Sequence, residues 1–377
     1  MLVTASVALT GCAPAVPVGP AAEPPPGVTS LSGAHDHSIQ ALAVTPDGAL
    51  VVTGARDHRI FVWDLAARKV QTVLRRHSRS VWAIAIAPDG GRLATSSDDL
   101  SILIWDLPRA RARGVFKGHE DSIRALAFTP DGRTLISGSR DNTVRLWDLV
   151  AWRPGPVLGG HGSTVRSLAV TPDGHTLASG SADDTIRIWG LPDGQLHHVL
   201  RAHADTVHAL VITPDGRTLI SGSGDKTVRF WDLEARRLET TLVPDRLGRP
   251  VTRWEEWQLD AGPEVLALAL SPDGRTLAVA IRDHTIRLVN VASRAESAVL
   301  RTGETTVYAI AFTPDGRFLV SGSDDRRLTL WELAAVTSGR PRAGARPGAQ
   351  TGPPRTSGPT REARRTCAKL RSCTRRC

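Results

Sequence analysis

The feature that constrains this chain most is the tripeptide Pro-Asp-Gly, which recurs in register along most of the sequence. The seven copies begin at Pro46, Pro88, Pro130, Pro172, Pro214, Pro272 and Pro314, with spacings of 42, 42, 42, 42, 58 and 42 residues. A period of about forty residues with four short apolar runs in each period is typical of a closed ring of small sheets. We therefore predict an all-β protein built from seven four-stranded antiparallel blades.

The third repeat shows how one blade is encoded. Apolar and other side chains alternate over residues 123–128, and Thr129-Pro130-Asp131-Gly132 has the composition of a tight turn. Further short strands are expected over residues 135–139 and 144–147, and a weaker fourth strand over 156–158. No run of roughly ten residues shows helical periodicity with caps, so we expect almost no helix.

The two ends of the repeat region indicate how the ring closes. The third strand of the last repeat ends near Trp331, and no convincing fourth strand follows it. Residues Val28 to Leu31, just before His35, occupy the fourth-strand position of the repeat. We predict that this N-terminal strand completes the seventh blade, which leaves fewer exposed sheet edges.

The repeat carries a set of polar and aromatic residues in fixed register. The closing dipeptide is Trp63-Asp64, Trp105-Asp106, Trp147-Asp148 and Trp231-Asp232, becomes Trp189-Gly190 and Trp331-Glu332, and is lost at Val289-Asn290. Six residues before it stand Asp57, Asp99, Asp141, Asp183, Asp225, Asp283 and Asp325, and eleven residues before Pro-Asp-Gly stand His35, His77, His119, His161 and His203. Repeats six and seven have Ala261 and Gly303 in place of the histidine, and repeat six has Val279 where a hydroxyl is expected.

These residues resemble the WD-repeat (Trp-Asp) β-propeller family, of bacterial type, over residues 28–333. The resemblance implies that the His, Asp and Trp of each unit form a structural network through a bridging hydroxyl. The expected hydroxyl bearers are Thr53, Thr95, Ser137, Ser179, Ser221 and Ser321. A hydrolase triad uses similar residue types, but an active site is normally singular and this set recurs in blade after blade. We therefore assign it a structural role and predict no catalytic residue.

The excess positive charge lies at the C-terminus. The chain has 47 basic and 38 acidic residues, of which residues 334–377 hold eleven and one, so this segment carries +10 and the remainder −1. Its Pro, Gly and Arg content favours a disordered tail that could bind nucleic acid or an anionic membrane by charge alone. Its cysteines (Cys367, Cys373 and Cys377) match no zinc motif, so neither metal nor cofactor is expected.

The N-terminus resembles that of a bacterial lipoprotein. Residues 1–9 are apolar and uncharged, and Leu9-Thr10-Gly11-Cys12 resembles a lipobox. Residues 1–12 would then be the signal and lipobox, with lipid on Cys12, and the Pro/Ala-rich residues 13–27 would tether the propeller to the cell envelope. A leader with a chance cysteine, on a cytoplasmic protein, is the alternative. The sequence contains no apolar stretch of about 18 residues or more, so we predict no membrane-spanning helix.

The resemblance also places the candidate binding positions. WD-repeat rings bind partners mostly on the face that carries the fourth-to-first-strand loops and the second-to-third-strand turns. Five residues after the histidine position stand Gln40, Trp82, Arg124, Arg166, His208, Leu266 and Tyr308, and immediately before the repeat aspartate stand Arg56, Asp98, Arg140, Ala182, Gly224, Arg282 and Asp324. Trp, Tyr and Arg dominate binding hot spots, so all of these except Gln40, Leu266, Ala182 and Gly224 are candidate partner contacts.

The 16 extra residues between repeats five and six contain two more tryptophans, Trp254 and Trp257. Exposed apolar patches of this kind mark interaction sites. These tryptophans either grip a partner or cover the sixth blade, which lacks its own tryptophan.

Together these patterns predict a non-catalytic, monomeric interaction platform that binds a protein or peptide on one face of the propeller. An acidic peptide could lie over Arg56, Arg124, Arg140 and Arg166. Two alternatives remain open: charge-driven binding through the tail, and an enzyme or small-molecule sensor that uses the central channel. Against the channel alternative, no unique acid pair, metal cluster or phosphate loop stands outside the repeats.

Overall fold

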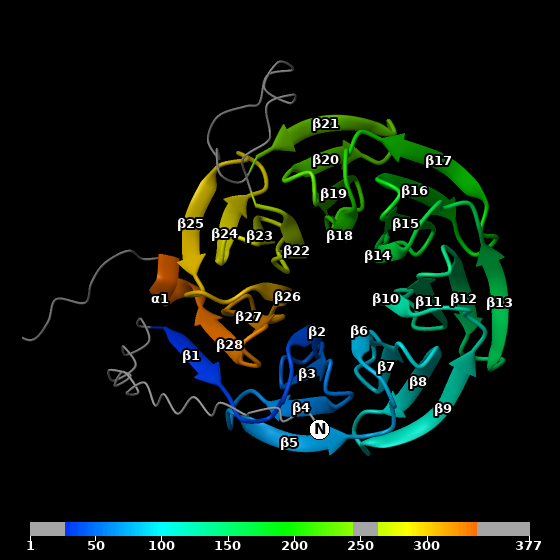
Figure 1. The fold of residues 1–377 in the computed structure, drawn as a ribbon. Helices are drawn as coiled ribbons and strands as arrows, with labels where there is room; N and C mark the ends of the chain where they lie inside the picture. The colour runs from blue at the N-terminus through cyan, green and yellow to red at the C-terminus, as the bar shows by residue number, and fades with distance from the viewer. Residues whose placement is uncertain (1–26, 244–262, 338–377) are drawn as a thin grey trace, which may run out of the picture. The chain divides into compact units, whose positions relative to one another are not determined.

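The computed structural model describes residues 27–243 and 263–337 and shows seven sheets arranged around a central axis (Figure 1). Each sheet has four antiparallel strands, and the first strand of every sheet lies nearest the axis. The first strands contact each other in sequence around the ring, and the last of them contacts the first. The structure is therefore the predicted seven-bladed β-propeller, with one short helix in its described part.

The blades are numbered from the N-terminus, with strands given from the axis outward. Blade 1 comprises β2 (Ile39–Val44), β3 (Leu50–Ala55), β4 (Ile60–Asp64) and β5 (Lys69–Leu74). Blade 2 comprises β6 (Val81–Ile86), β7 (Arg92–Ser97), β8 (Ser101–Asp106) and β9 (Arg111–Lys117). Blade 3 comprises β10 (Ile123–Phe128), β11 (Thr134–Ser139), β12 (Val144–Asp148) and β13 (Arg153–Leu158). Blade 4 comprises β14 (Val165–Val170), β15 (Thr176–Ser181), β16 (Thr185–Gly190) and β17 (Leu196–Arg201).

Blade 5 comprises β18 (Val207–Ile212), β19 (Thr218–Ser223), β20 (Val228–Asp232) and β21 (Arg237–Leu242). Blade 6 comprises β22 (Val265–Leu270), β23 (Thr276–Ile281), β24 (Thr285–Asn290) and β25 (Glu296–Arg301). Blade 7 comprises β26 (Val307–Phe312), β27 (Phe318–Ser323), β28 (Leu328–Glu332) and the N-terminal β1 (Val28–Leu31).

Blade 7 is closed by the N-terminal strand, as predicted. β1 pairs antiparallel with β28 in a register that sets Val28 opposite Trp331 and Leu31 opposite Leu328. A helix, α1 (Leu333–Thr337), follows β28 directly, and its Leu333 and Val336 pack against the core shared by blades 6 and 7. The domain boundary predicted at residue 333 therefore falls inside this helix, because its apolar side chains extend the packed core beyond the last strand.

The Pro-Asp-Gly segments form the turns between first and second strands. In blade 3 the N–H of Gly132 donates to the carbonyl of Thr129 at 2.8 Å, and Gly132 has a φ of +66°. The Asp131 carboxylate accepts from the Thr129 hydroxyl at 2.5 Å and from the N–H of Arg133 at 2.9 Å. Glycine is favoured at this position because it adopts a positive φ without steric cost.

The core consists of clusters that span neighbouring blades. Trp147 of blade 3 is 1% exposed and packs with Ile102, Ile104 and Phe116 of blade 2. At the point of closure, Trp63 of blade 1 packs in the same way with Val320 and Leu328 of blade 7. A blade cannot bury both faces alone, so each tryptophan contributes to the interface that holds the ring together.

Candidate interaction face

A hydrogen-bonded network of the same geometry recurs in blades 1–5, which we call the complete blades. In blade 3, Trp147 Nε1 donates to Ser137 Oγ at 2.8 Å, His119 Nε2 lies 2.7 Å from the same oxygen, and His119 Nδ1 lies 2.7 Å from Asp141 Oδ2. The other four complete blades reproduce these contacts at 2.7–2.9 Å through Thr53, Thr95, Ser179 and Ser221.

Charge and burial assign the protons in this network. Burial would raise the pKa of Asp183, but hydrogen bonds from Thr185, the N–H of Gly162 and His161 outweigh it and lower the pKa to about 2. The pKa values of Asp57, Asp99, Asp141 and Asp225 are also lowered, against a similar effect of burial. Burial lowers the pKa of His161 and His203, so a neutral ring donates from Nδ1 to the aspartate and accepts the hydroxyl hydrogen at Nε2.

The network's geometry explains why it is a poor candidate for catalysis. The bridging hydroxyls of Thr53, Ser137 and Ser221 are fully buried, so a substrate cannot reach the oxygen that would act as nucleophile. That oxygen also already accepts the tryptophan N–H, and both nitrogens of the histidine are occupied. All groups are satisfied within the blade, which is the arrangement expected of a buried structural network.

Blades 6 and 7 depart from this pattern in different ways. Blade 6 has Val279 and Val289, both 1% exposed, in place of the hydroxyl and the tryptophan, and they pack in one apolar cluster with Phe230 of blade 5. Its Asp283 lies 3.5 Å from Arg287, which also pairs with Glu296 at 3.1 Å. Blade 7 keeps the Trp331-to-Ser321 hydrogen bond at 2.9 Å but has Gly303 at the histidine position.

The first class of candidate binding positions, five residues after the histidine position, coincides with a β-bulge in every blade. The pairing of first and second strands shifts register at one residue, which is Trp82 in blade 2, Arg124 in blade 3, Arg166 in blade 4 and Tyr308 in blade 7. The remaining bulges fall at Gln40, His208 and Leu266. A bulge re-aims the side chain of the extra residue, so the fold presents these positions together where the first strands begin.

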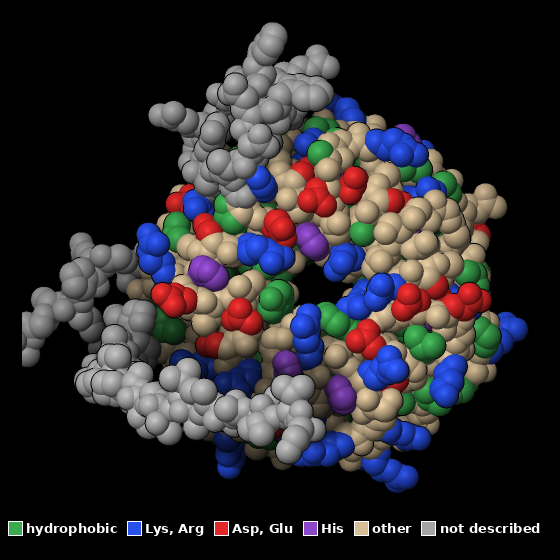
Figure 2. All heavy atoms as spheres, in the orientation of Figure 1, with side chains coloured by type: hydrophobic (Ala, Val, Ile, Leu, Met, Phe, Trp, Pro, Cys, Tyr) green, Lys and Arg blue, Asp and Glu red, His purple; other side chains and the backbone are tan. Residues whose placement is uncertain are grey.

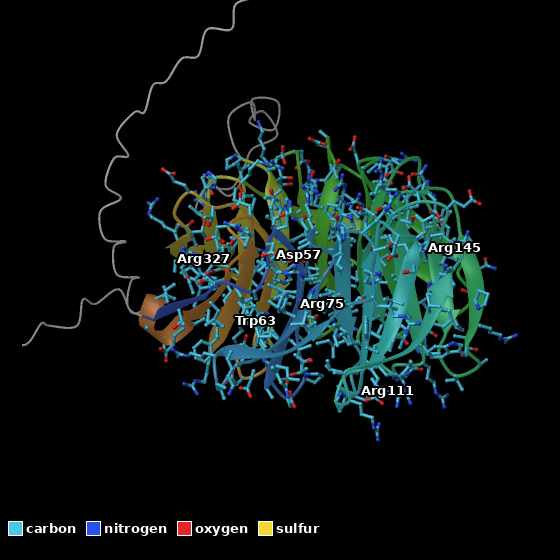
Figure 3. All side chains as sticks on the ribbon, turned by 60° about the horizontal axis from the view of Figure 1, so that its bottom comes forward. Asp57, Trp63, Arg75, Arg111, Arg145 and Arg327 are labelled. Atoms are coloured by element: carbon cyan, nitrogen blue, oxygen red, sulfur yellow. The ribbon has the colours of Figure 1, made fainter. Side chains whose placement is uncertain are left out.

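The second class of candidate positions, immediately before each repeat aspartate, lies on the turns between second and third strands. These turns lie beside the bulges of the first class. The backbone N–H of Asp98 donates to the carbonyl of Ser80 at 3.1 Å, and that of Arg140 donates to Ser122 at 2.8 Å. Equivalent bonds tie Arg56, Ala182, Gly224, Arg282 and Asp324 to the residues just before each first strand. We call the end of the ring that carries these turns and the loops between blades the rim face. Figure 3 shows Asp57 and Arg327 toward this end and Arg111 at the other.

A stacked cluster occupies the rim face where blades 1, 2 and 3 meet. The guanidinium of Arg124 lies 3.7 Å from the centre of the Trp82 ring, and that of Arg56 lies 5.1 Å from it. Asp98 lies 3.4 Å from Arg124 and also accepts a short hydrogen bond from Ser122. The Trp82 ring is thus held by two cations, each at a distance at which cation–π attraction is effective.

Blades 3 and 4 add further arginines close to this cluster. Burial lowers the pKa of Arg124 to about 10; the Asp98 carboxylate opposes this, and the charges of Arg166 and Arg140 add to it. Partial desolvation and the charge of Arg140 lower the pKa of Arg166. Burial, and then the charge of Arg166, lower the pKa of His208 to about 4. Repulsion among Arg124, Arg140 and Arg166 disfavours their charged forms, whereas His208 is neutral at pH 7, so the three arginines favour an anion that lies among them.

The other candidates have partners of their own. Arg140 lies 3.9 Å from Asp121, Arg282 pairs with Glu264 at 2.7 Å, and the Asp324 carboxylate accepts from the N–H of Thr306 at 3.0 Å. Tyr308 is half-buried at its bulge. Cys12, Trp254, Trp257 and the basic tail beyond Thr337 lie outside the described residues.

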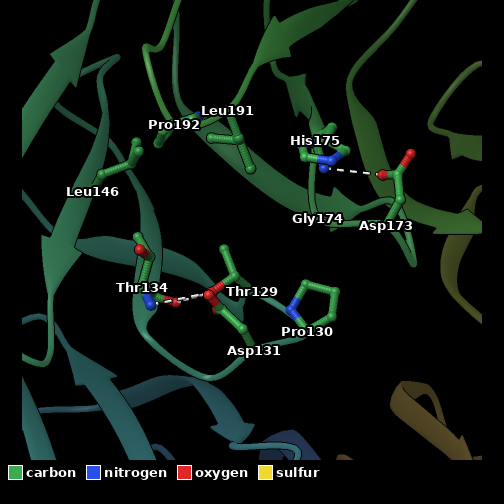
Figure 4. Close-up of a pocket in the computed structure, with 10 residues that line it drawn as sticks. All are labelled: Thr129, Pro130, Asp131, Thr134, Leu146, Asp173, Gly174, His175, Leu191 and Pro192. Carbon is green, nitrogen blue, oxygen red and sulfur yellow. Dashed lines mark hydrogen bonds between the residues drawn. The ribbon is translucent and has the colours of Figure 1, made fainter.

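A hollow that the sequence did not indicate lies between blades 3 and 4 at the other end of the ring. It has a volume of about 460 Å³ and is lined by the Pro-Asp-Gly turns of both blades together with Leu146, Leu191 and Pro192 (Figure 4). Asp131 and Asp173 are engaged with Thr129 and Thr171 and with backbone N–H groups of their own turns. The polar atoms of this hollow therefore stabilise the turns, and we assign it no binding role.

Comparison with known proteins agrees with the geometry. The family described as WD domain, G-beta repeat, matches residues 28–64, 68–106, 111–148, 152–190, 194–232 and 297–332. The chain belongs to this family. Each match spans the fourth strand of one blade and the first three strands of the next. Residues 233–296 carry no match, and they include most of blade 6, which lacks both the bridging hydroxyl and the tryptophan.

The curated relatives match over short stretches. The chain is 36% identical over 85 residues to Elongator complex protein 2 of Dictyostelium discoideum, covering 21% of this chain and 9% of the relative. It is 37% identical over 71 residues to guanine nucleotide-binding protein subunit beta-like protein 1 of Mus musculus, covering 19% and 22%. It is 37% identical over 65 residues to apoptotic protease-activating factor 1 of Danio rerio, covering 17% and 5%. The chain thus spans less than a quarter of each relative.

None of the described helices is long and apolar enough to cross a membrane. Residues 27–243 and 263–337 contain no group of three or more His, Cys, Asp or Glu side chains arranged to hold a metal ion.

Proposed function

We propose that this protein is a non-catalytic interaction platform that binds an acidic segment of a protein partner on the rim face. The observation that carries the proposal is the cluster in which Arg56 and Arg124 lie over Trp82, with Arg140 and Arg166 beside it. WD-repeat propellers typically mediate contacts between proteins and are generally not enzymes. The acidic partner is our inference from the chemistry of the cluster.

The charge distribution around the ring axis supports this choice of partner. Figure 2 looks onto the rim face and shows Lys and Arg side chains around the hollow at its centre, with Asp and Glu side chains mostly farther out. A carboxylate in this region would meet arginines that already lower one another's pKa, so its binding relieves repulsion as well as adding attraction. Arginine also suits carboxylates because its planar fork binds them through two parallel hydrogen bonds.

The aromatic residues supply the apolar part of the surface. Trp82 and Tyr308 are both half-buried, so each offers a rigid face that loses little conformational entropy when a partner covers it. The bulges at these two residues hold them at the same level of the ring as Arg124 and Arg166. A partner strand or loop that lies across the channel mouth would meet both residue types.

The experiment compares one rim variant with a control of equal charge change. Fluorescent acidic peptides, and basic peptides of the same length, are titrated against the wild type, Arg124→Ala/Arg166→Ala and Arg111→Ala/Arg237→Ala. Arg111 and Arg237 are exposed, begin fourth strands and lie far from the rim face. We expect acidic peptides to bind the wild type and the control equally, and the rim variant at least tenfold more weakly, which is about 1.4 kcal/mol. Equal affinities for the two double variants would refute the site.

A second pair of variants separates charge from surface contact. Trp82→Ala/Tyr308→Ala leaves the net charge unchanged and removes both aromatic faces. We expect it to weaken binding at every salt concentration, whereas the arginine variant should also reduce the salt dependence. If the salt dependence of peptide binding is the same in all variants, charge at the rim does not select the partner.

A further inference from the structure

Blade 7 contains a polar pocket at the position that the network histidine occupies in the complete blades. It has a volume of about 280 Å³ and is lined by residues of β26, β27, β28 and β1 and of the loop that leads into blade 7. Arg327, which is labelled in Figure 3, is one of the residues that line it. The volume is several times the ~30 Å³ share of one water molecule, so the pocket has room for a small ring.

Two small residues create this pocket. Gly303 stands where the complete blades have the network histidine, and a side-chain carbon built on Gly303 would meet no atom within 4 Å. Thr329 stands two residues before the blade's tryptophan, where the other blades have Phe61, Leu103, Arg145, Arg187, Arg229 and Arg287. In blade 1 the ring of Phe61 packs edge-on against His35 at 4.4 Å. Blade 7 therefore lacks both the imidazole and the long side chain that covers it.

The hydrogen-bonding groups that hold the histidine elsewhere are still present. Ser321 Oγ accepts from Trp331 Nε1 at 2.9 Å, as Ser137 does from Trp147 in blade 3. Asp325 Oδ1 accepts from the N–H of Arg327 at 3.0 Å and, at short distance, from the Ser323 hydroxyl. Asp325 Oδ2 corresponds to the oxygen that receives His119 Nδ1 in blade 3, and it lies 3.7 Å from Arg327 Nε. The pocket thus keeps an acceptor and a hydroxyl on either side of the vacant ring position.

We propose that the blade 7 pocket binds an imidazole group from outside the chain. One ring N–H donates to Asp325 Oδ2, and the other ring nitrogen accepts the hydrogen of the Ser321 hydroxyl. The group could be a small imidazole-bearing molecule or the histidine side chain of a bound peptide, and both share this chemistry. The site lies apart from the Trp82 cluster, so it does not depend on the rim proposal.

The pocket's chemistry discriminates against other groups. An ammonium or guanidinium group carries donors only, and would leave the Ser321 hydrogen without an acceptor. A carboxylate carries acceptors only, and would have no hydrogen to donate to Asp325 Oδ2. Neutral imidazole offers one donor and one acceptor in a flat frame, and the five complete blades hold that frame between the same residue types at 2.7–2.9 Å.

The test titrates the full chain with imidazole, with N-acetyl-histidine methylamide and with 1-methylimidazole, while the indole N–H resonance of Trp331 is followed by NMR. We expect a saturable shift with the first two probes and at least tenfold weaker binding of 1-methylimidazole, which cannot donate from its second nitrogen. If N-acetyl-histidine methylamide binds as tightly as imidazole, or more tightly, the natural ligand is the histidine side chain of a partner. If imidazole binds at least tenfold more tightly than N-acetyl-histidine methylamide, the natural ligand is a free small molecule.

Two variants decide whether binding occurs in this pocket. Thr329→Arg introduces the side chain that four other blades carry at that position, so it should fold and fill the pocket. Asp325→Asn keeps the shape of the side chain and removes the charged acceptor. We expect each variant to bind imidazole at least tenfold more weakly than the wild type. The proposal is overturned if the wild type shows no saturable shift, or if both variants bind imidazole as tightly as it does.

Discussion

Blades 3 and 6 have the same four strands and the same turns, yet they stabilise their centres by different means. Blade 3 joins His119, Ser137 and Trp147 in a buried polar network that ends on Asp141. Blade 6 replaces the hydroxyl and the indole with Val279 and Val289, which pack in an apolar cluster. The polar network is therefore not required to form a blade in this fold, since apolar packing of suitable volume serves the same position.

Blades 6 and 7 differ in how much of the polar network they have lost. Blade 6 has lost the network's hydrogen-bonding centre as a unit, so no buried indole or hydroxyl remains to be satisfied there. Blade 7 has lost only the imidazole, so Ser321 and Asp325 keep hydrogen-bonding capacity toward a vacant position. A network that loses one member leaves a site for a ligand, whereas one replaced by apolar side chains leaves packed core.

The network tryptophan of blade 3 should contribute far more to stability than the tryptophan on the rim face. Trp147→Ala removes a side chain that is 1% exposed and packs across two blades. We expect it to lower the free energy of unfolding by about 3–5 kcal/mol, measured by chemical denaturation. Trp82→Ala removes a half-buried ring that mainly stacks on arginines, and should cost about 1 kcal/mol. Equal losses would mean that position in the blade does not determine the role of a tryptophan.

The fold was predictable from the sequence because each turn and strand is specified locally and repeated. The Pro-Asp-Gly turns and the alternation over residues such as 123–128 predicted the blades. The absence of a last strand in the seventh repeat predicted that residues 28–31 close the ring. The helix at residues 333–337 was missed because one turn of helix is too short to show a period. Its formation depends on packing against a core that exists only in the folded ring.

The site was predictable only in part. The register placed Trp82 and Arg124 in one class of positions, but their stacking at 3.7 Å depends on a β-bulge that no residue type signals. The blade 7 pocket was hidden for a different reason. Gly303 was recognised as a missing histidine, but the hollow also requires the short side chain of Thr329, and this pairing appears only when the blade is assembled.

Blades 3 and 7 differ in how many buried groups lose a hydrogen-bond partner when the bridging serine is removed. Ser137→Ala leaves two buried groups without their partner, the Trp147 N–H and one nitrogen of His119. Ser321→Ala leaves only the Trp331 N–H. We expect the loss of unfolding free energy in the blade 3 variant to exceed that in the blade 7 variant by about 1–3 kcal/mol, the cost of one further unsatisfied buried group. Identical losses in denaturation experiments would show that the histidine contributes nothing to the network.

We also expect the free energy of unfolding to fall modestly as the pH is lowered. The pKa of His161 is lowered in the folded protein, so its stabilising contribution is present above the unfolded value of about 6.5 and falls as pH drops through the folded value. The pKa of Asp183 is lowered to about 2, so its contribution is present above the unfolded value of about 3.9 and falls as pH drops toward 2. Both groups therefore make the complete blades less stable in acid, in two separate ranges of pH.

Asp183→Asn isolates the lower of these ranges. The variant should be less stable than the wild type at pH 7 by on the order of 1 kcal/mol, because solvent screens part of the carboxylate's interaction, and the difference should shrink between pH 4 and pH 2. Asp193→Asn, in an exposed turn of the same blade, serves as the matched control and should leave the pH profile of the unfolding free energy nearly unchanged. A constant difference between Asp183→Asn and the wild type from pH 7 to pH 2 would mean that the charge of Asp183 does not stabilise the blade, and that the carboxylate acts only as a neutral hydrogen-bond acceptor for His161.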